Sequence, residues 1–249
     1  MNAWAPAAMA GVGILVGSAA RVEVFRSSVP AGSPRQAACP RCACELVHPG
    51  RLWHSWAVLC RGTCRSCGSR IGPPLAAVEL ATAFPFAALT LCVDALVPLL
   101  VYCFVAAVGV TLTFVDLAVH RLPDRLTITL ATGVVAAFGI TSLADGERMA
   151  LLEGLVSGLG VALVYVLMWL VTSGGISLGD AKLALGLGVV VGWSGWRSAV
   201  FAVVLGLVLT GLAAVVLLSA GRASRNDPIP HGPFMILAAL TTVSAIHTW

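Results

Sequence analysis

The amino-acid sequence predicts an all-α polytopic membrane protein of about eight transmembrane helices, with a small cytosolic zinc-ribbon-like loop. The composition is the first reason, because 59% of the 249 residues are hydrophobic and only 10% are charged. The mean hydropathy of +0.96 and apolar runs near the ~20 residues that a bilayer-crossing helix needs exclude a soluble globular protein. The distribution of positive charge and a pair of cysteine motifs are the other two reasons.

Eight apolar stretches are the candidate spans, and one of them is short. They cover approximately residues 2–20, 75–93, 95–115, 126–144, 150–172, 181–193, 197–220 and 231–248. These stretches divide the chain into a first transmembrane helix at 1–20, a Cys-rich loop at 21–74 and a multi-helix membrane core at 75–249. A cleaved signal peptide is the alternative for 1–20, but its apolar part should follow positive residues. Arg21 is the first positive residue of the chain, which favours a retained span.

Positive charge gathers on one predicted side of the membrane. If the chain starts outside, four segments face the cytosol, and they hold 13 of the 15 Lys and Arg residues. These segments are 21–74, 116–125, 173–182 and 221–230. Because short cytosolic loops collect Lys and Arg, both termini are expected outside. Topology also explains the net charge of +4, and no nucleic-acid partner is expected, since it would need a dedicated basic surface.

Two aspartates mark the cytosolic ends of predicted spans. The third span runs inward and ends at Asp116, two spans go out and back, and Asp180 opens the sixth, so both acids are expected near the same membrane face. An ionisable residue within a membrane helix costs roughly 2.5 to 3.5 kcal/mol on insertion scales. Two carboxylates that approach closely can share one proton and work as an acid and base. The alternative is that each acid caps a helix or meets water, which suits Asp180 better, because a helix C-terminus disfavours negative charge.

The residues around these acids have simpler expected roles. Gly175 and Gly179 allow the backbone to approach a neighbouring segment closely, and Ser177 between them is also small. Lys182 is expected to reach the interface or to steady a neighbouring acid. Asp124 stands where an N-cap of the fourth span belongs.

The segment 21–74 contains two CxxC motifs. They supply Cys39, Cys42, Cys64 and Cys67, which could bind Zn²⁺ tetrahedrally as in a zinc ribbon. Disulfides are the alternative, but the Arg-rich loop is assigned to the reducing cytosol. Cys44 and Cys60 lie beside the motifs and are alternate ligands. A metal would help to fold a loop of about 50 residues that has little core of its own.

Several segments, in order, resemble the prepilin peptidases, or type IV leader peptidases, which are membrane aspartyl proteases with a Gly-x-Gly-Asp signature. The segments are GILVGSAARVEVFR, CPRC, SWAVLCRGTCRSCGSRI, VEL, FVDLAVHRLPD, GISLGDAKLALGLG and IPHGPF. The resemblance maps the two catalytic acids to Asp116 and Asp180. It covers nearly the whole chain, and Ser177 stands where the first Gly of the signature is expected.

The resemblance implies that the chain cleaves the short basic leader of prepilins or pseudopilins at the cytosolic face of a bacterial inner (plasma) membrane. The substrate and membrane lipid are then its partners, and the oligomeric state is not assigned. Many family members also methylate the new N-terminus with S-adenosylmethionine. Three departures bear on that second activity: Arg21 replaces Asn, Gly50-Arg51-Leu52 replaces Asn-Ile-Pro, and Leu75-Ala76 replaces Tyr-Pro.

Two other classes of function are compatible with the residues alone. A proton-coupled small transporter would use intramembrane acids as a relay. A membrane scaffold would use the zinc ribbon for binding and leave the acids idle. The expected position of both acids near one face, and not at mid-membrane, argues against transport.

Overall fold

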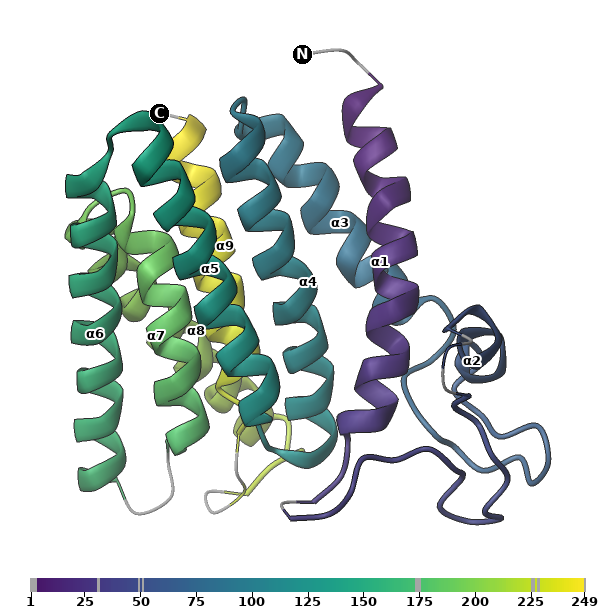
Figure 1. The fold of residues 1–249 in the computed structure, drawn as a ribbon. Helices are drawn as coiled ribbons and strands as arrows, with labels where there is room; N and C mark the ends of the chain where they lie inside the picture. Colours follow the sequence, from purple (N-terminus) through teal and green to yellow (C-terminus); the bar gives the residue numbers. More distant parts are fainter. Residues whose placement is uncertain are drawn as a thin grey trace. The chain divides into compact units, whose positions relative to one another are not determined.

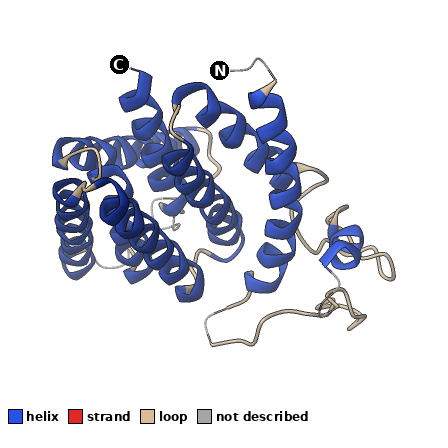
Figure 2. Ribbon diagram, turned by 45° about the horizontal axis from the view of Figure 1, so that its top comes forward, coloured by secondary structure: helices blue, strands red, loops and turns tan. Residues whose placement is uncertain are grey.

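The computed structural model is helical, as the sequence predicts (Figures 1 and 2). The structure describes residues 4–30, 32–48, 50, 52–172, 176–224, 227 and 229–248. Its helices are α1 (Ala5–Ser27), α2 (Leu52–Leu59), α3 (Ala77–Cys92), α4 (Leu96–Val119), α5 (Asp124–Asp145), α6 (Arg148–Val171), α7 (Leu178–Gly192), α8 (Trp196–Ser219) and α9 (Gly232–Thr248). Eight of them lie at the eight predicted spans, and α2 is an additional short helix within the Cys-rich loop.

The helices differ in how readily they could cross a bilayer. In the described part of the chain, α1, α4, α5, α6 and α8 are long and apolar enough to span a membrane, and α3 and α9 are shorter apolar helices. Helix α7 has 15 residues, which at 1.5 Å per residue give about 22 Å. That length falls short of a hydrocarbon core of about 30 Å.

The chain divides into two compact units. Unit 1 comprises Met1–Asp94 and Ala106–Arg121, and unit 2 comprises Ala95–Val105 and Leu122–Trp249. Unit 1 therefore contains α1, the Cys-rich loop, α3 and the second half of α4. Unit 2 contains the first part of α4 and all of α5 to α9.

In unit 1, helices α1 and α3 pack closely through glycine. A Cβ added to Gly13 would lie 2.6 Å from the Cα of Ala83, and one added to Gly17 would lie 2.6 Å from the Cα of Glu79. Any side chain at these positions would push the two backbones apart. Small residues thus allow the close helix contact that is common in membrane proteins.

Helix α1 continues seven residues beyond the predicted end of the first span at residue 20. The prediction stopped there because Arg21 is charged, but its side chain is only 1% exposed. Its Nε and one terminal nitrogen each donate to a carboxylate oxygen of Glu79 at 2.7 Å. The guanidinium also donates to the carbonyl oxygens of Pro73 and Pro74 at 2.9 Å, and Trp56 Nε1 donates to Glu79 Oε1 at 2.8 Å. The buried charge is therefore fully paired, and the helix can continue through it.

In unit 2, α5, α6, α8 and α9 all contact α7 (Figure 1). Glycines again set the spacing between helices. A Cβ on Gly188 of α7 would lie 2.8 Å from the Cα of Gly158 on α6, and one on Gly192 would lie 2.4 Å from the Cβ of Ser157. A Cβ on Gly186 would meet the fully buried Leu130 of α5 at 2.3 Å. Most of α7 is buried in this way, so longer neighbours surround a helix that is short for a bilayer.

We expect the Arg21–Glu79 pair to be a strong determinant of the stability of unit 1. Removing one partner leaves an uncompensated buried charge, so Arg21→Met or Glu79→Gln should each destabilise the protein by about 3–5 kcal/mol. The double variant should lose clearly less than the sum of the two, because neither charge is then left alone. Thermal or denaturant unfolding of the purified protein in detergent measures these differences.

Arg35 provides the matched control, because its ion pair with Glu23 is partly exposed. Arg35→Met should cost at most about 1 kcal/mol. Strict additivity of the two buried substitutions would contradict the proposed coupling.

Candidate active site

Asp180 lies in the first turn of α7, and its carboxylate is part of the helix cap. The N-cap residue is Ser177, whose Oγ accepts from the backbone N–H of Asp180 at 3.2 Å. In return, Oδ2 of Asp180 accepts from the backbone N–H of Ser177 at 2.7 Å and from its Oγ–H at 2.8 Å. This reciprocal arrangement is a capping box, with Asp in the place of the more common Glu. It fixes the orientation of a carboxyl group that is only 6% exposed.

Gly179 allows the first turn of α7 to approach the segment that precedes α5. A Cβ at this position would lie 3.1 Å from the Cβ of Leu122 and 3.2 Å from the Oγ of Ser177. A larger residue would therefore press on both the neighbouring segment and the cap of Asp180. The expected role of Gly179 in close backbone approach agrees with this geometry, whereas Gly175 lies outside the described residues.

Lys182 steadies an acid other than Asp180. Its Nζ donates to Oδ1 of Asp124 at 2.7 Å, and both side chains are about half exposed. The prediction that Asp124 is an N-cap is wrong, because α5 begins at Asp124, Pro123 takes the N-cap position, and no side chain caps this helix. The ion pair competes for the Asp124 carboxylate. An exposed ion pair stabilises a protein by at most about 1 kcal/mol. This pair joins the start of α5 to the start of α7.

A buried polar network that the sequence analysis did not assign lies near Asp180 in unit 2. Nε2 of His231 is 2.8 Å from the hydroxyl of Tyr165, and its Nδ1 is 2.7 Å from Oγ1 of Thr210. Both His231 and Tyr165 interact electrostatically with Asp180. His231 belongs to the IPHGPF segment, so the motif was visible, but its partners on α6 and α8 were not.

Asp116 lies in unit 1, near the end of α4. Its side chain is 6% exposed, and the adjacent Val115 is fully buried. Helix α4 ends three residues later, where His120 adopts a left-handed conformation with φ of 49°. The carboxyl group thus lies in an apolar helix close to its C-terminus, where a negative charge has no help from the helix dipole.

A cavity of about 440 Å³ lies beside this end of α4 within unit 1. Residues on both sides of Asp116 line it, together with the end of α1 and parts of the Cys-rich loop. The lining from α4 comprises Phe114, Leu117 and Ala118, and the loop contributes Gln36, Pro40, Arg70, Ile71, Gly72, Pro73 and Pro74. The loop therefore forms one wall of the space next to a candidate catalytic acid. Because Asp116 and Asp180 belong to different units, their pairing stays a prediction.

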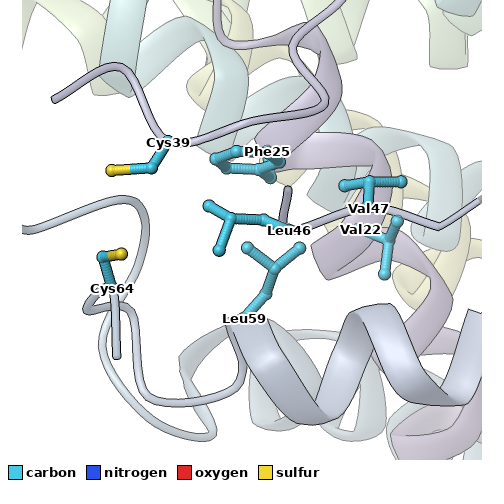
Figure 3. Close-up of a cluster of buried hydrophobic side chains, with 7 residues drawn as sticks. All are labelled: Val22, Phe25, Cys39, Leu46, Val47, Leu59 and Cys64. Atoms are coloured by element: carbon cyan, nitrogen blue, oxygen red, sulfur yellow. The ribbon is translucent and has the colours of Figure 1, made fainter. Parts of the chain in front are cut away.

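The Cys-rich loop brings its cysteines together. Sulfur atoms of Cys39, Cys42, Cys44 and Cys64 all lie within 4.8 Å of one another, and Cys67 Sγ is 3.7 Å from Cys39 Sγ. All eight cysteines of the chain are free thiols, so the structure gives no support to the disulfide alternative. Figure 3 shows Cys39 and Cys64 at the edge of a small apolar cluster that includes Phe25 of α1, Leu46 and Leu59.

This donor set fits a tetrahedral metal ion such as zinc. Zinc–sulfur bonds of about 2.3 Å place the sulfurs of a tetrahedron about 3.8 Å apart. The Cys39–Cys67 and Cys42–Cys64 sulfur distances are 3.7 and 3.6 Å. A hydrogen bond from Ser69, followed by backbone hydrogen bonds from Cys42 and Arg41, lowers the pKa of the Cys39 thiol to about 6. The lowered pKa favours the thiolate, which is the form that binds metal.

Comparisons with known proteins agree with these features. The family model described as the type IV leader peptidase family matches residues 103–219, and that of the bacterial peptidase A24 N-terminal domain matches residues 12–93. A prepilin leader peptidase/N-methyltransferase of Bacillus subtilis (strain 168) is 32% identical over 206 residues, which cover 81% of this chain and 77% of that protein. The chain belongs to the type IV leader peptidase family.

Other relatives in the family carry the same description. The Aeromonas hydrophila protein is 29% identical over 228 residues, covering 85% of this chain and 73% of its own length. The Pseudomonas aeruginosa protein is 30% identical over 217 residues, covering 81% and 68%. No solved structure gives a significant match. Within the chain, the peptidase match includes both Asp116 and Asp180. The N-terminal match includes α1 from residue 12 on, the Cys-rich loop and α3.

Ser177 is a departure from the family signature that the geometry explains. Glycine at this position could not supply the Oγ that bonds both the backbone and the carboxylate of Asp180. The hydroxyl thus adds a donor to the acid and a cap to α7. A Ser or Thr at the N-cap typically stabilises a helix by about 1 kcal/mol relative to Ala.

Replacing Ser177 should therefore affect both the cap and the chemistry. We expect Ser177→Ala to lower kcat of leader cleavage several-fold while KM changes little, because Asp180 loses one of the donors that orient it. Ser177→Thr, which keeps the hydroxyl, should stay near wild type. Steady-state kinetics on a prepilin substrate checks this, and equal kcat values for the Ala and wild-type proteins would contradict an orienting role.

Proposed function

We propose that this protein is a membrane-embedded aspartic endopeptidase that removes the short basic leader of prepilins or pseudopilins at the cytosolic face. One observation carries the proposal: the segment that matches the peptidase family contains two aspartates, Asp116 and Asp180, whose carboxyl groups are both buried. Buried carboxyl groups in apolar helices are expensive and usually functional. The relatives in other bacteria are described by this activity.

The chemistry requires one ionised and one protonated carboxyl group. The ionised group takes a proton from water, and the resulting hydroxide adds to the scissile carbonyl carbon while the protonated group gives its proton to the carbonyl oxygen. When this intermediate collapses, the C–N bond breaks as one of its hydroxyls returns a proton to the second carboxylate, and the leaving nitrogen receives the proton that water gave up. Two acids suffice for both transfers, and either Asp116 or Asp180 can be the base.

Two features support the pairing of these acids. The charge bias and the order of the spans predict that the end of α4 and the start of α7 face the same side of the membrane. Asp124, eight positions after Asp116, bonds to Lys182, two positions after Asp180. The capping box then holds the Asp180 carboxylate in one orientation, as a base or a proton donor requires.

We assign Cys39, Cys42, Cys64 and Cys67 as ligands of a structural zinc ion. The zinc would fold the loop that walls the cavity beside Asp116, and it supplies no catalytic step. The proposed orientation places both termini outside the inner membrane, with the zinc loop and both acids at the cytosolic face. The thirteen positive residues of the predicted cytosolic segments support this orientation.

N-methylation of the new N-terminus is a second candidate activity, because the relatives' descriptions include it. In this chain, Arg21 replaces the usual Asn and occupies the Glu79 carboxylate through two hydrogen bonds. S-adenosylmethionine would be the methyl donor. The mass of the cleaved product reports this activity directly, as an increment of one methylene group.

Asp116→Asn and Asp180→Asn should each reduce leader cleavage by roughly 10²–10⁴-fold, the usual contribution of an acid or base. The assay uses membranes with matched amounts of each protein and a short-leader prepilin, and mass spectrometry identifies the product. Asp145→Asn is the matched control, because Asp145 is an exposed residue at the C-terminal end of α5. Substantial cleavage by either of the first two variants would refute the paired-acid mechanism and return attention to transport or scaffolding.

Metal removal should loosen the Cys-rich loop without unfolding the membrane helices. Because metal binding supplies folding free energy to small metal-bound loops, we expect chelation to accelerate tryptic cleavage after Arg41, Arg61 or Arg65 by at least about 10-fold. Added zinc should reverse the effect. Intact helical circular dichroism after chelation is the control, and an unchanged cleavage rate would contradict a structural metal.

A further inference from the structure

The two cysteine motifs of the loop are copies of one backbone structure. Counting each motif from its first Cys, the N–H of residue 1 donates to the carbonyl of residue 6, and the N–H of residue 5 donates to the carbonyl of residue 1. In the first motif these residues are Cys39, Ala43 and Cys44. In the second they are Cys64, Gly68 and Ser69, and all four bonds measure 2.8–2.9 Å. The fifth residue is left-handed in both, with φ of 56° and 70°. Isolated antiparallel bridges flank both turns, Ala38 with Glu45 and Thr63 with Arg70.

This repeat has a constant offset of 25 residues, so it makes Cys44 the structural equivalent of Ser69. Their side-chain contacts obey the same symmetry. Ser69 Oγ lies 3.0 Å from Cys67 Sγ and 3.5 Å from Cys39 Sγ. Cys44 Sγ lies 3.3 Å from both Cys42 Sγ and Cys64 Sγ. Each sixth residue thus touches the second cysteine of its own motif and the first cysteine of the other.

One copy therefore places a hydroxyl where the other places a fifth thiol. Two of the possible sets of four sulfurs have the spacing that a metal ion needs. The symmetric set is Cys39, Cys42, Cys64 and Cys67, with 3.6–3.7 Å between the cross-motif pairs. The second set replaces Cys67 with Cys44, and all four of its sulfurs lie within 4.8 Å of one another. Cys42 is exposed and Cys44 is partly exposed, so this side of the cluster is open to solvent.

We propose that Cys44 is an exchangeable ligand, which can take the place of Cys67 on the metal ion. In the exchange, a Cys44–metal bond forms as the Cys67–metal bond breaks; Cys44 gives up its proton and Cys67 gains one, so the charge of the site is unchanged. The ion then has two resting sets of four sulfurs and an exit at the Cys42–Cys44 side. The inference rests on the metal binding proposed above. It adds a route by which the metal ion enters and leaves the site.

Cobalt(II) is a suitable probe, because its visible and near-ultraviolet bands report the number of bound sulfurs. The full-length protein in detergent is loaded with Co²⁺ as wild type, Cys44→Ser, Cys67→Ser and the double variant. Both single variants should bind one Co²⁺ with a four-sulfur spectrum. The double variant should show a three-sulfur spectrum and an affinity lower by at least roughly 10-fold. Cys60→Ser is the matched control, because Cys60 bonds to the Ala57 carbonyl outside the cluster.

The outcomes separate this inference from the metal site itself. A three-sulfur spectrum in Cys67→Ser, equal to that of the double variant, would overturn the exchange while leaving the four-cysteine site intact. A wild-type protein that binds no Co²⁺ would overturn both. If Cys67→Ser fails to fold, the rate of Co²⁺ loss to a chelator decides: it should be slower in Cys44→Ser than in wild type, and equal rates would reject the proposal.

Discussion

The free-energy cost of ionisable groups in an apolar chain is the constraint on which most of this structure depends. Two of the buried charged groups are met by specific partners, one from a distant part of the sequence and one from the adjacent helix cap. Arg21 on α1 is neutralised by Glu79 on α3, and the Asp180 carboxylate is held by Ser177. These contacts decide where helices continue, where they start and which loops they hold. An apolar sequence pattern alone would place the same helices but would not fix their ends.

Hydropathy and charge bias were sufficient to locate the helices of the bundle, because a run of apolar residues has few alternatives in a membrane. They failed at the end of α1, because a charged residue such as Arg21 is expected in a loop. Its partner Glu79, 58 positions away, cannot be identified from the local pattern. They also failed at Asp124, where a capping position was expected and an ion pair with Lys182 was found. Both errors concern long-range pairing, which local pattern does not encode.

The candidate site shows the same division. Asp116 and Asp180 could be selected from the sequence by their places at span ends. The Ser177-x-x-Asp180 spacing of a capping box is also present in the sequence, but the sequence analysis did not assign it. The network of His231 with Tyr165 and Thr210 could not be selected, because it depends on how α6, α8 and the start of α9 come together. The equivalence of Cys44 and Ser69 required the backbone, although the two motifs were plain in the sequence.

In the capping box, the Oδ2 atom of Asp180 has both a structural role and a proposed chemical role. Oδ2 completes the start of α7 and belongs to the group proposed to handle protons. A change that moves the carboxylate also frays the first turn, and a change that frays the turn releases the carboxylate. Asparagine can preserve the cap while removing the acid, because its amide oxygen still accepts the Ser177 bonds. The start of α7 is in this sense maintained by an atom of the group that is proposed to carry out the reaction.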